Sequence, residues 1–227
     1  MNATLQSQDR SDPARPTQGG TRPPSALFRW AVRHFRKPEG FWGGVAGWIM
    51  ARRASNLERN RWTVELLDVQ PADWVLEIGF GPGVALGWLA ERASQGVVVG
   101  IDHSELMLRR AARRNAAAVA AGRIALQLGA LERMPDLGTS FDKIMAVNVA
   151  MFWPDPPVQL GALRERLRPG GRIALTIQPR ARGATDADAR RIGEALVQQV
   201  RAAGYREVRL ELRPMQPVAA ACVLGLR

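Results

Sequence analysis

A glycine-rich turn after the first strongly apolar segment is the clearest place in the chain for ligand chemistry. The segment 74–80 reads WVLEIGF, and Gly79, Gly81 and Gly83 alternate with other residues before a helical pattern begins at position 84. Glycine has no Cβ, so the backbone of such a turn approaches a ligand closely, and a turn that opens a helix is a frequent ligand site. The turn therefore predicts a small-molecule site where the strand ends.

The spacing of this turn differs from the dinucleotide-binding fingerprint. G-x-G-x-x-G needs its third glycine at position 84, where this chain has Val84. Glu77 stands two residues before Gly79, where a carboxylate is a poor neighbour for a pyrophosphate. The same carboxylate is a suitable neighbour for an ammonium group, so the turn favours a ligand that carries one.

A second carboxylate closes the next apolar segment. Asp102 ends the segment VVVGID and stands 23 residues after Gly79. A carboxylate at this distance accepts hydrogen bonds from both hydroxyl groups of a ribose. Enzymes that use NAD employ the same device, so Asp102 indicates a nucleoside without identifying the cofactor.

These residues need a parallel sheet to bring them together. Apolar, β-branched segments alternate with helical ones after Pro71, which is typical of a doubly wound α/β fold. The last two apolar segments lie too close together for a helical crossover and predict an antiparallel hairpin. We expect an α/β, Rossmann-like fold: a seven-stranded, mainly parallel sheet with a C-terminal antiparallel hairpin and an N-terminal helical cap. The expected strands are 74–80, 97–102, 123–129, 141–149, 172–178, 206–212 and 218–226, and the expected helices are 57–67, 84–93, 104–121, 156–167 and 186–204.

The N-terminal quarter differs in composition from the rest of the chain. Residues 1–25 are rich in Ser, Pro, Gly, Gln and Arg without periodicity, which predicts a disordered tail. Residues 26–70 mix aromatic side chains with arginine and predict a helical cap or lid. Residues 71–227 then form the binding domain, because 227 residues suffice for one such domain with a full core but not for two.

Three further stretches complete a recognisable order of motifs. They are Gly129-Ala130-Leu131-Glu132-Arg133-Met134-Pro135, the strand that opens at Phe141 and ends at Asn148, and the turn Leu167-Arg168-Pro169-Gly170-Gly171-Arg172. Together with the glycine turn and Asp102, they resemble the class I S-adenosylmethionine-dependent methyltransferases over about residues 60–227. The resemblance implies a methyltransferase with S-adenosylmethionine as its cofactor.

The resemblance also implies a role for each site residue. The glycine turn and Glu77 would cradle the methionine part of the cofactor, and Asp102 would hold its ribose. Met107 would lie against the adenine, and His103 would contact the cofactor beside Asp102. Asn148 would lie beside the sulfonium.

The adenine loop departs from the family pattern. The family has an aspartate that recognises the adenine amino group, where this chain has Ala130. Recognition of the adenine would then fall to backbone groups near Leu131.

The transfer itself demands few catalytic groups. The methyl group of a sulfonium is already activated, so proximity and desolvation carry most of the acceleration. The catalytic residues therefore stay unassigned, with His34 as a candidate base for an acceptor that must lose a proton, and no metal site is expected. The fourth strand is followed by Asn148-Val149-Ala150-Met151, not by the Asp-Pro-Pro-Tyr or Asn-Pro-Pro-Tyr of the nucleobase and glutamine methylating subfamilies.

Apolar and aromatic residues indicate the class of the acceptor. Trp42 in the cap and Met151, Phe152 and Trp153 after the fourth strand are expected to line a hydrophobic pocket. The stretch 41–67 also resembles, more loosely, the segment ahead of the glycine turn in bacterial phospholipid N-methyltransferase-like proteins. We expect methyl transfer to a small apolar or amphipathic acceptor.

The charge of the chain leaves other functions open. The net charge is +11, and residues 1–62 carry eleven basic and four acidic side chains, a net of +7. Such a region suits peripheral contact with an anionic membrane, or RNA in an RNA methyltransferase. No separate RNA-binding module is visible, so nucleic acid is not the expected partner. A non-catalytic S-adenosylmethionine-binding protein is the remaining alternative.

Cysteine usage and hydropathy indicate the compartment. Cys222 is the single cysteine and stands in an apolar segment, so an internal disulfide is excluded and a core position is expected. No apolar run reaches the roughly 18 residues of a membrane span, and the N-terminus has no signal-peptide pattern. We therefore expect a cytoplasmic protein.

Overall fold

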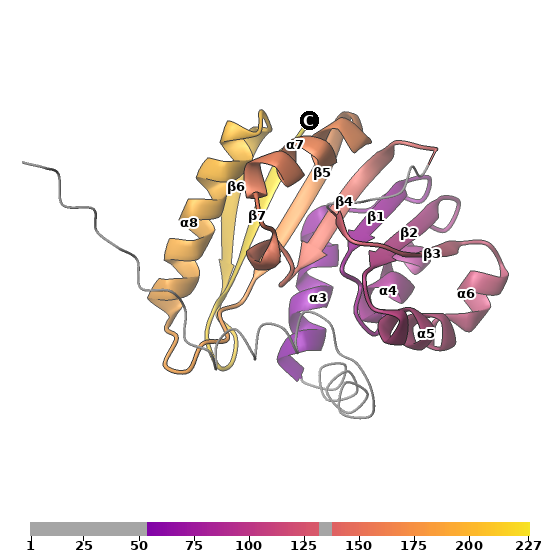
Figure 1. Cartoon of the computed structure of the whole chain (residues 1–227), viewed down its shortest axis with the longest axis horizontal. Coiled ribbons are helices and arrows are strands. Elements are labelled where there is room, and N and C mark those ends of the chain that lie inside the picture. Colours follow the sequence, from indigo (N-terminus) through magenta and orange to yellow (C-terminus); the bar gives the residue numbers. More distant parts are fainter. Residues whose placement is uncertain (1–53, 132–137) are drawn as a thin grey trace, which may run out of the picture.

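The computed structural model describes residues 54–131 and 138–227 (Figure 1). The tail expected over 1–25 and most of the cap expected over 26–70 lie outside the described residues. So do two residues expected to serve the site, His34 and Trp42.

Strands and helices alternate along the described chain, and a hairpin closes it. The helices are α3 (Ala54–Leu67), α4 (Val84–Arg92), α5 (Glu105–Arg114), α6 (Ala116–Ala120), α7 (Pro156–Arg166) and α8 (Asp186–Ala202), with a 3₁₀ turn η2 (Ala150–Phe152). The strands are β1 (Trp74–Ile78), β2 (Val97–Asp102), β3 (Ile124–Leu128), β4 (Phe141–Val147), β5 (Leu167–Ile177), β6 (Arg206–Arg213) and β7 (Ala220–Leu226). Within the described ranges no helix is long and apolar enough to cross a membrane.

The strands form one seven-stranded sheet in the order β3-β2-β1-β4-β5-β7-β6. β1 to β5 pair in parallel, whereas β7 is antiparallel to both of its neighbours, β5 and β6. The expected fold class and the C-terminal hairpin are therefore confirmed. The strand order reverses between β1 and β4, and ligands of open α/β sheets bind beyond the carboxyl ends of the strands at such a point.

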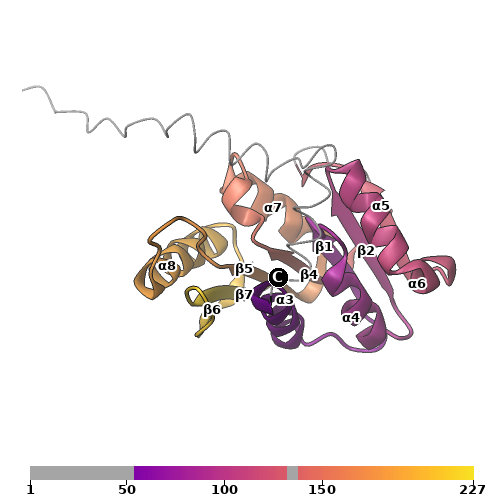
Figure 2. The same cartoon turned by 90° about the horizontal axis from the view of Figure 1, so that it is seen from below.

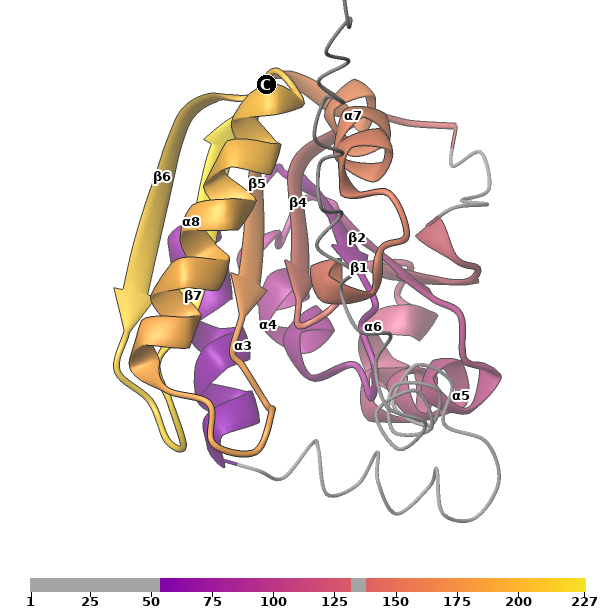
Figure 3. The same cartoon turned by 60° about the vertical axis from the view of Figure 1, so that its left-hand side comes forward.

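Helices cover both faces of the sheet. Viewed along its edge, α3 and α4 lie on one side, and α7 and α8 lie on the other (Figure 2). The strands are buried on both faces, so neighbouring residues of β4 enter different cores: Met145 packs under α3 and α4, and Ile144 packs under α7. In Figure 3, α8 stands in front of β5, β7 and β6, with α3 behind them.

Two elements differ most from their expected bounds. The helix expected over 104–121 breaks at Asn115, whose side-chain Nδ2 donates to the carbonyl oxygens of Gly83 at 2.9 Å and Ala111 at 3.0 Å. Strand β5 begins at Leu167 instead of 172, because Leu167 pairs with Phe141 ahead of a shift in register. The hydrogen bond from Asn115 to Gly83 fastens the end of α5 to the end of the glycine turn.

Helix α3 runs antiparallel to β5. Near the end of β5, the hydroxyls of Thr63 and Thr176 lie 2.7 Å apart. At the middle of β5, Arg172 Nη1 lies 3.5 Å from the carbonyl oxygen of Leu67, the last residue of α3. The first turns of α3 therefore stand at the carboxyl edge of the sheet, beside the switch point.

Candidate functional site

The three glycines of the turn serve different purposes. All have positive φ: 68° at Gly79, 54° at Gly81 and 73° at Gly83. A Cβ on Gly79 would lie 2.5 Å from Val149 Cγ2, and one on Gly83 would lie 2.7 Å from Ala111 Cβ. A Cβ on Gly81 would meet nothing within 4 Å. The outer two glycines thus permit close packing, and Gly81 leaves bare backbone facing open space.

Glu77 is a buried carboxyl group with one unpaired oxygen. The residue is 3% exposed, and its Oε2 accepts no hydrogen bond. Burial, followed by the charge of Asp102, raises the pKa of Glu77 to about 8. A buried acceptor in this state is stabilised by a cation or a donor that arrives from outside.

Asp102 joins the glycine turn to the start of α5. Its Oδ2 accepts from the backbone N–H of Gly81 at 2.8 Å, and its Oδ1 accepts from that of Ser104 at 2.9 Å. Burial raises the pKa of Asp102 in spite of these bonds. A carboxylate has about four acceptor positions, so two remain for a ligand. His103 Nδ1 lies 3.7 Å from Asp102 Oδ1, which places this histidine at the end of β2.

The loop after β3 lies against the same edge. Gly129 donates its N–H to the carbonyl oxygen of Asp102 at 2.9 Å, and Ala130 and Leu131 follow it half-buried. Met107, in the first turn of α5, is buried in the core under α3 and α4. The rest of the loop, 132–137, lies outside the described residues.

Asn148 ends β4 in a strained backbone conformation. Its φ is 55°, in the left-handed region, and its Oδ1 accepts from the N–H of Gln178 at 2.7 Å. That bond fixes the orientation of the amide group, since only the oxygen can accept. The amide Nδ2 is buried and has no partner. Strain of this kind persists where the surrounding structure holds it, and it gathers at functional sites.

The residues expected to line the acceptor pocket separate into two groups. Met151 is 44% exposed and Phe152 is half-buried, both in η2. Trp153 is buried, and its Nε1 is a donor without a partner. Trp153 therefore packs under this edge, and Met151 offers apolar surface upon it.

Two residues of this edge were absent from the sequence expectations. Arg59 of α3 is 1% exposed and donates to the side-chain oxygen of Gln178, which directly follows β5. The signal available in the sequence was helical spacing: Arg59, Thr63 and Leu67 recur every fourth residue and all are buried. An arginine on the apolar face of a helix was therefore the feature that marked this position.

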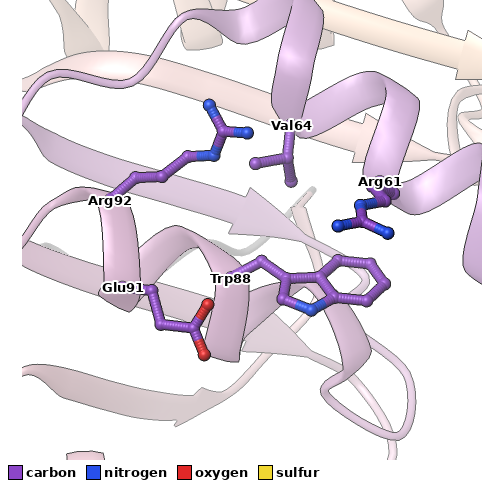
Figure 4. A pocket seen from close by; sticks show the side chains of 5 residues that line it. All are labelled: Arg61, Val64, Trp88, Glu91 and Arg92. Carbon is purple, nitrogen blue, oxygen red and sulfur yellow. The ribbon is translucent and has the colours of Figure 1, made fainter.

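A small hollow on the surface is not part of this edge. A pocket of about 90 Å³ lies between α3 and α4, lined by Arg61, Val64, Trp88, Glu91 and Arg92 (Figure 4). It contains none of the residues discussed above. Within the described residues, no three His, Cys, Asp or Glu side chains gather in a way that could hold a metal ion.

The described part of the carboxyl edge thus contains both unpaired hydrogen-bond donors and an unpaired acceptor. Four buried side-chain atoms there have no hydrogen-bond partner: the acceptor Oε2 of Glu77, and the donors Arg59 Nε, Asn148 Nδ2 and Trp153 Nε1. Buried polar atoms are rarely left unpaired, so their concentration at one edge indicates a polar ligand.

Several proteins with similar sequences are methyltransferases. Residues 75–171 match the family described as "Methyltransferase domain". An uncharacterized methyltransferase of Bacillus subtilis, YdaC, is 33% identical over 178 residues, which cover 78% of this chain and 95% of that protein. The nocamycin O-methyltransferase of Saccharothrix syringae is 37% identical over 114 residues, 50% of this chain and 40% of that enzyme.

Solved structures agree on the fold. The N-methyltransferase NodS of Bradyrhizobium japonicum, in complex with S-adenosyl-L-homocysteine, has a TM-score of 0.63 at 19% identity, covering 79% of this chain and 91% of that chain. Magnesium protoporphyrin IX methyltransferase of Synechocystis, with bound S-adenosylhomocysteine, has a TM-score of 0.60 at 16% identity, covering 88% and 93%.

The fold and the motifs define an S-adenosylmethionine-dependent methyltransferase with a Rossmann-like sheet. The chain belongs to the class I family of these enzymes, and S-adenosylmethionine is its cofactor. The predicted enzyme class and cofactor are confirmed.

Proposed function

We propose that the enzyme transfers the methyl group to a small apolar or amphipathic acceptor. The observation that carries the proposal is the stretch from Val149 to Trp153, which follows the switch point and contains no charged side chain. Met151 exposes its side chain there, beside the unpaired amide of Asn148. Such a surface offers apolar contact with one or two polar anchors, as small-molecule pockets do.

The polar groups of the edge fit the cofactor. S-adenosylmethionine carries an ammonium group, and Glu77 offers it a buried oxygen without a partner. Asp102 keeps acceptor capacity for the ribose hydroxyls beyond its two backbone bonds. Gly81 faces open space, so the methionine part can lie directly on the backbone. We assign these three residues to the cofactor.

The adenine side of the proposed site is mostly apolar. Met107 lies one turn into α5 and Leu131 follows β3, so both flank the end of β2 where the ribose would sit. Ala130 supplies only its backbone, and His103 adds a partly exposed ring beside Asp102. We assign these four residues to adenosine contacts, with Gly79 and Gly83 shaping the turn.

This chain needs to do two things for the chemistry: align the cofactor with the acceptor, and exclude water. Bound S-adenosylmethionine brings an activated methyl group on its sulfonium. Asn148 holds the end of β4 next to the glycine turn, which would set the distance between cofactor and acceptor. We place His103 on the cofactor side of the site, and we therefore do not assign it as a base for the acceptor. The transfer is therefore assigned to alignment in a dry site.

A methyl-transfer screen tests the proposal. The full chain would be incubated with methyl-labelled S-adenosylmethionine and, in separate reactions, a metabolite pool, a lipid extract and total RNA. Label in the metabolite or lipid fraction supports the proposal, and Asp102→Ala should reduce it at limiting cofactor. Label confined to RNA would contradict it and would establish the rival RNA methyltransferase.

A further inference from the structure

The buried guanidinium of Arg59 is the feature of the site that the proposed function has not used. Arg59 is 1% exposed and lies in α3 at the carboxyl edge of β5. Its Nη1 donates to the side-chain oxygen of Gln178, and its Nη2 donates to Asn56 Oδ1 at 2.7 Å. Its Nε is buried and has no partner. Its Nη1 also lies 3.5 Å from the backbone carbonyl oxygen of Ser55, so its partners among the described residues are all neutral amide oxygens.

No carboxylate in the described ranges forms an ion pair with Arg59. The charge that bears on it most is that of another arginine, Arg180, two residues beyond Gln178. Burial, followed by this like charge, lowers the pKa of Arg59 to about 9. A buried charge is costly unless it is paired, and removal from water strengthens its attraction to an anion. The arrangement therefore stores an unfavourable interaction that an anion would relieve.

The surroundings of Arg59 contain a second donor for an anion. Gln178 links Arg59 to the switch point, because the backbone N–H of Gln178 donates to Asn148 Oδ1. The free Nδ2 of Asn148 is thus a second unpaired donor one residue contact away.

From this geometry we infer that Arg59 binds a carboxylate group of a ligand held at the carboxyl edge, with Gln178 fixing the orientation of the guanidinium. The guanidinium fork matches a carboxylate in shape as well as in charge. The inference rests on the proposed site. Two molecules of the proposed reaction can supply the carboxylate. One is the cofactor, through its methionine carboxylate, and the other is an amphipathic acid as the acceptor.

A matched pair of cofactors tests the first source. Decarboxylated S-adenosylmethionine differs from S-adenosylmethionine only in lacking the carboxylate. Calorimetry on the full chain should show the intact cofactor binding about 10- to 100-fold more tightly, the value of a charge-assisted hydrogen bond. In Arg59→Met the two ligands should bind alike.

Carboxylic acids and their amides test the second source. Hexanoate and benzoate, compared with hexanamide and benzamide, would be titrated into the protein saturated with S-adenosylhomocysteine. If the acceptor supplies the carboxylate, the wild type prefers the acids and Arg59→Met loses that preference, whereas the preference for the intact cofactor is the same in both proteins.

Arg61→Met is the control. Arg61 belongs to the same helix, but its side chain is 74% exposed, lies 3.8 Å from Glu65 and faces the pocket of Figure 4. Its loss removes the same charge and should change neither preference. Arg59→Lys keeps a cation but not the fork, and should retain part of the preference that Arg59→Met loses. If Arg59→Met fails to fold, Arg59→Lys decides the question by the same ratios.

The outcomes are separable. The inference is overturned if a folded Arg59 variant shows the wild-type ratios for both the cofactor pair and the acid–amide pairs, or if the wild type has no preference in either. Failure of the wild type to bind S-adenosylmethionine at all would instead contradict the assignment of the site.

Discussion

The buried carboxyl of Glu77 makes a quantitative prediction about stability and pH. Its pKa is raised from 4.5 to about 8 by burial and by Asp102. Below pH 4.5 the group is protonated in both the folded and the unfolded chain, and its contribution to stability is fully present. Between pH 4.5 and 8 only the unfolded chain releases the proton, so this stability is lost as the pH rises.

The variant Glu77→Gln isolates this effect, because glutamine keeps the shape of the side chain and does not titrate. The free energy of unfolding of the wild type, measured relative to that of Glu77→Gln, should fall by about 2–3 kcal/mol between pH 5.5 and 7.5. The other titrating groups are common to the two proteins, and their contributions cancel in the difference, except that of Asp102, whose charge interacts with Glu77.

Urea unfolding followed by tryptophan fluorescence, without cofactor, at pH 5.5, 6.5 and 7.5 measures the difference. Glu65→Gln, an exposed position on α3, controls for the loss of one carboxyl group. A difference between wild type and Glu77→Gln that stays constant across these pH values would refute the reasoning. Calorimetry in two buffers should also show that cofactor binding at pH 7 releases most of one proton from the wild type and none from Glu77→Gln.

Three other predictions address the remaining parts of the site. Asp102→Ala should weaken cofactor affinity by about 1.5–3 kcal/mol, since charge-assisted bonds to the ribose are lost; an unchanged dissociation constant would exclude Asp102 as the ribose ligand. Gly81→Ala and Gly122→Ala both place a Cβ in open space at positive φ, so each should lose about 1 kcal/mol of stability, but only Gly81→Ala should weaken cofactor binding; equal affinities would mean that no ligand approaches Gly81. Removal of residues 1–53 should abolish methyl transfer and leave cofactor affinity within about tenfold, because the glycine turn and Asp102 remain; retained transfer would show that the cap is not needed over the acceptor.

Local sequence signals were sufficient for most of the fold. The strands were recognisable because apolar, β-branched segments buried on both faces of a parallel sheet leave little polar alternation. The hairpin followed from the short distance between the last two segments, which excludes a helical crossover. The breaks that the sequence did not indicate depend on remote contacts. The helix expected over 104–121 breaks at Asn115, whose side chain reaches back to the carbonyl of Gly83, a partner 32 residues away.

The amino-acid sequence by itself determined the cofactor side of the site, since Glu77, the three glycines and Asp102 stand at strand ends whose positions follow from the pattern. Their roles in binding remain predictions, as does the acceptor pocket. Only the tertiary structure decided which of these groups are satisfied internally. It tied both oxygens of Asp102 to backbone N–H groups, left Glu77 Oε2 without a partner and placed Trp153 in the interior. It also brought Arg59 to Gln178 across 119 residues of sequence, because α3 crosses the sheet antiparallel to β5. Pairing of buried polar atoms depends on distances between distant segments, and a linear pattern of residue types does not contain those distances.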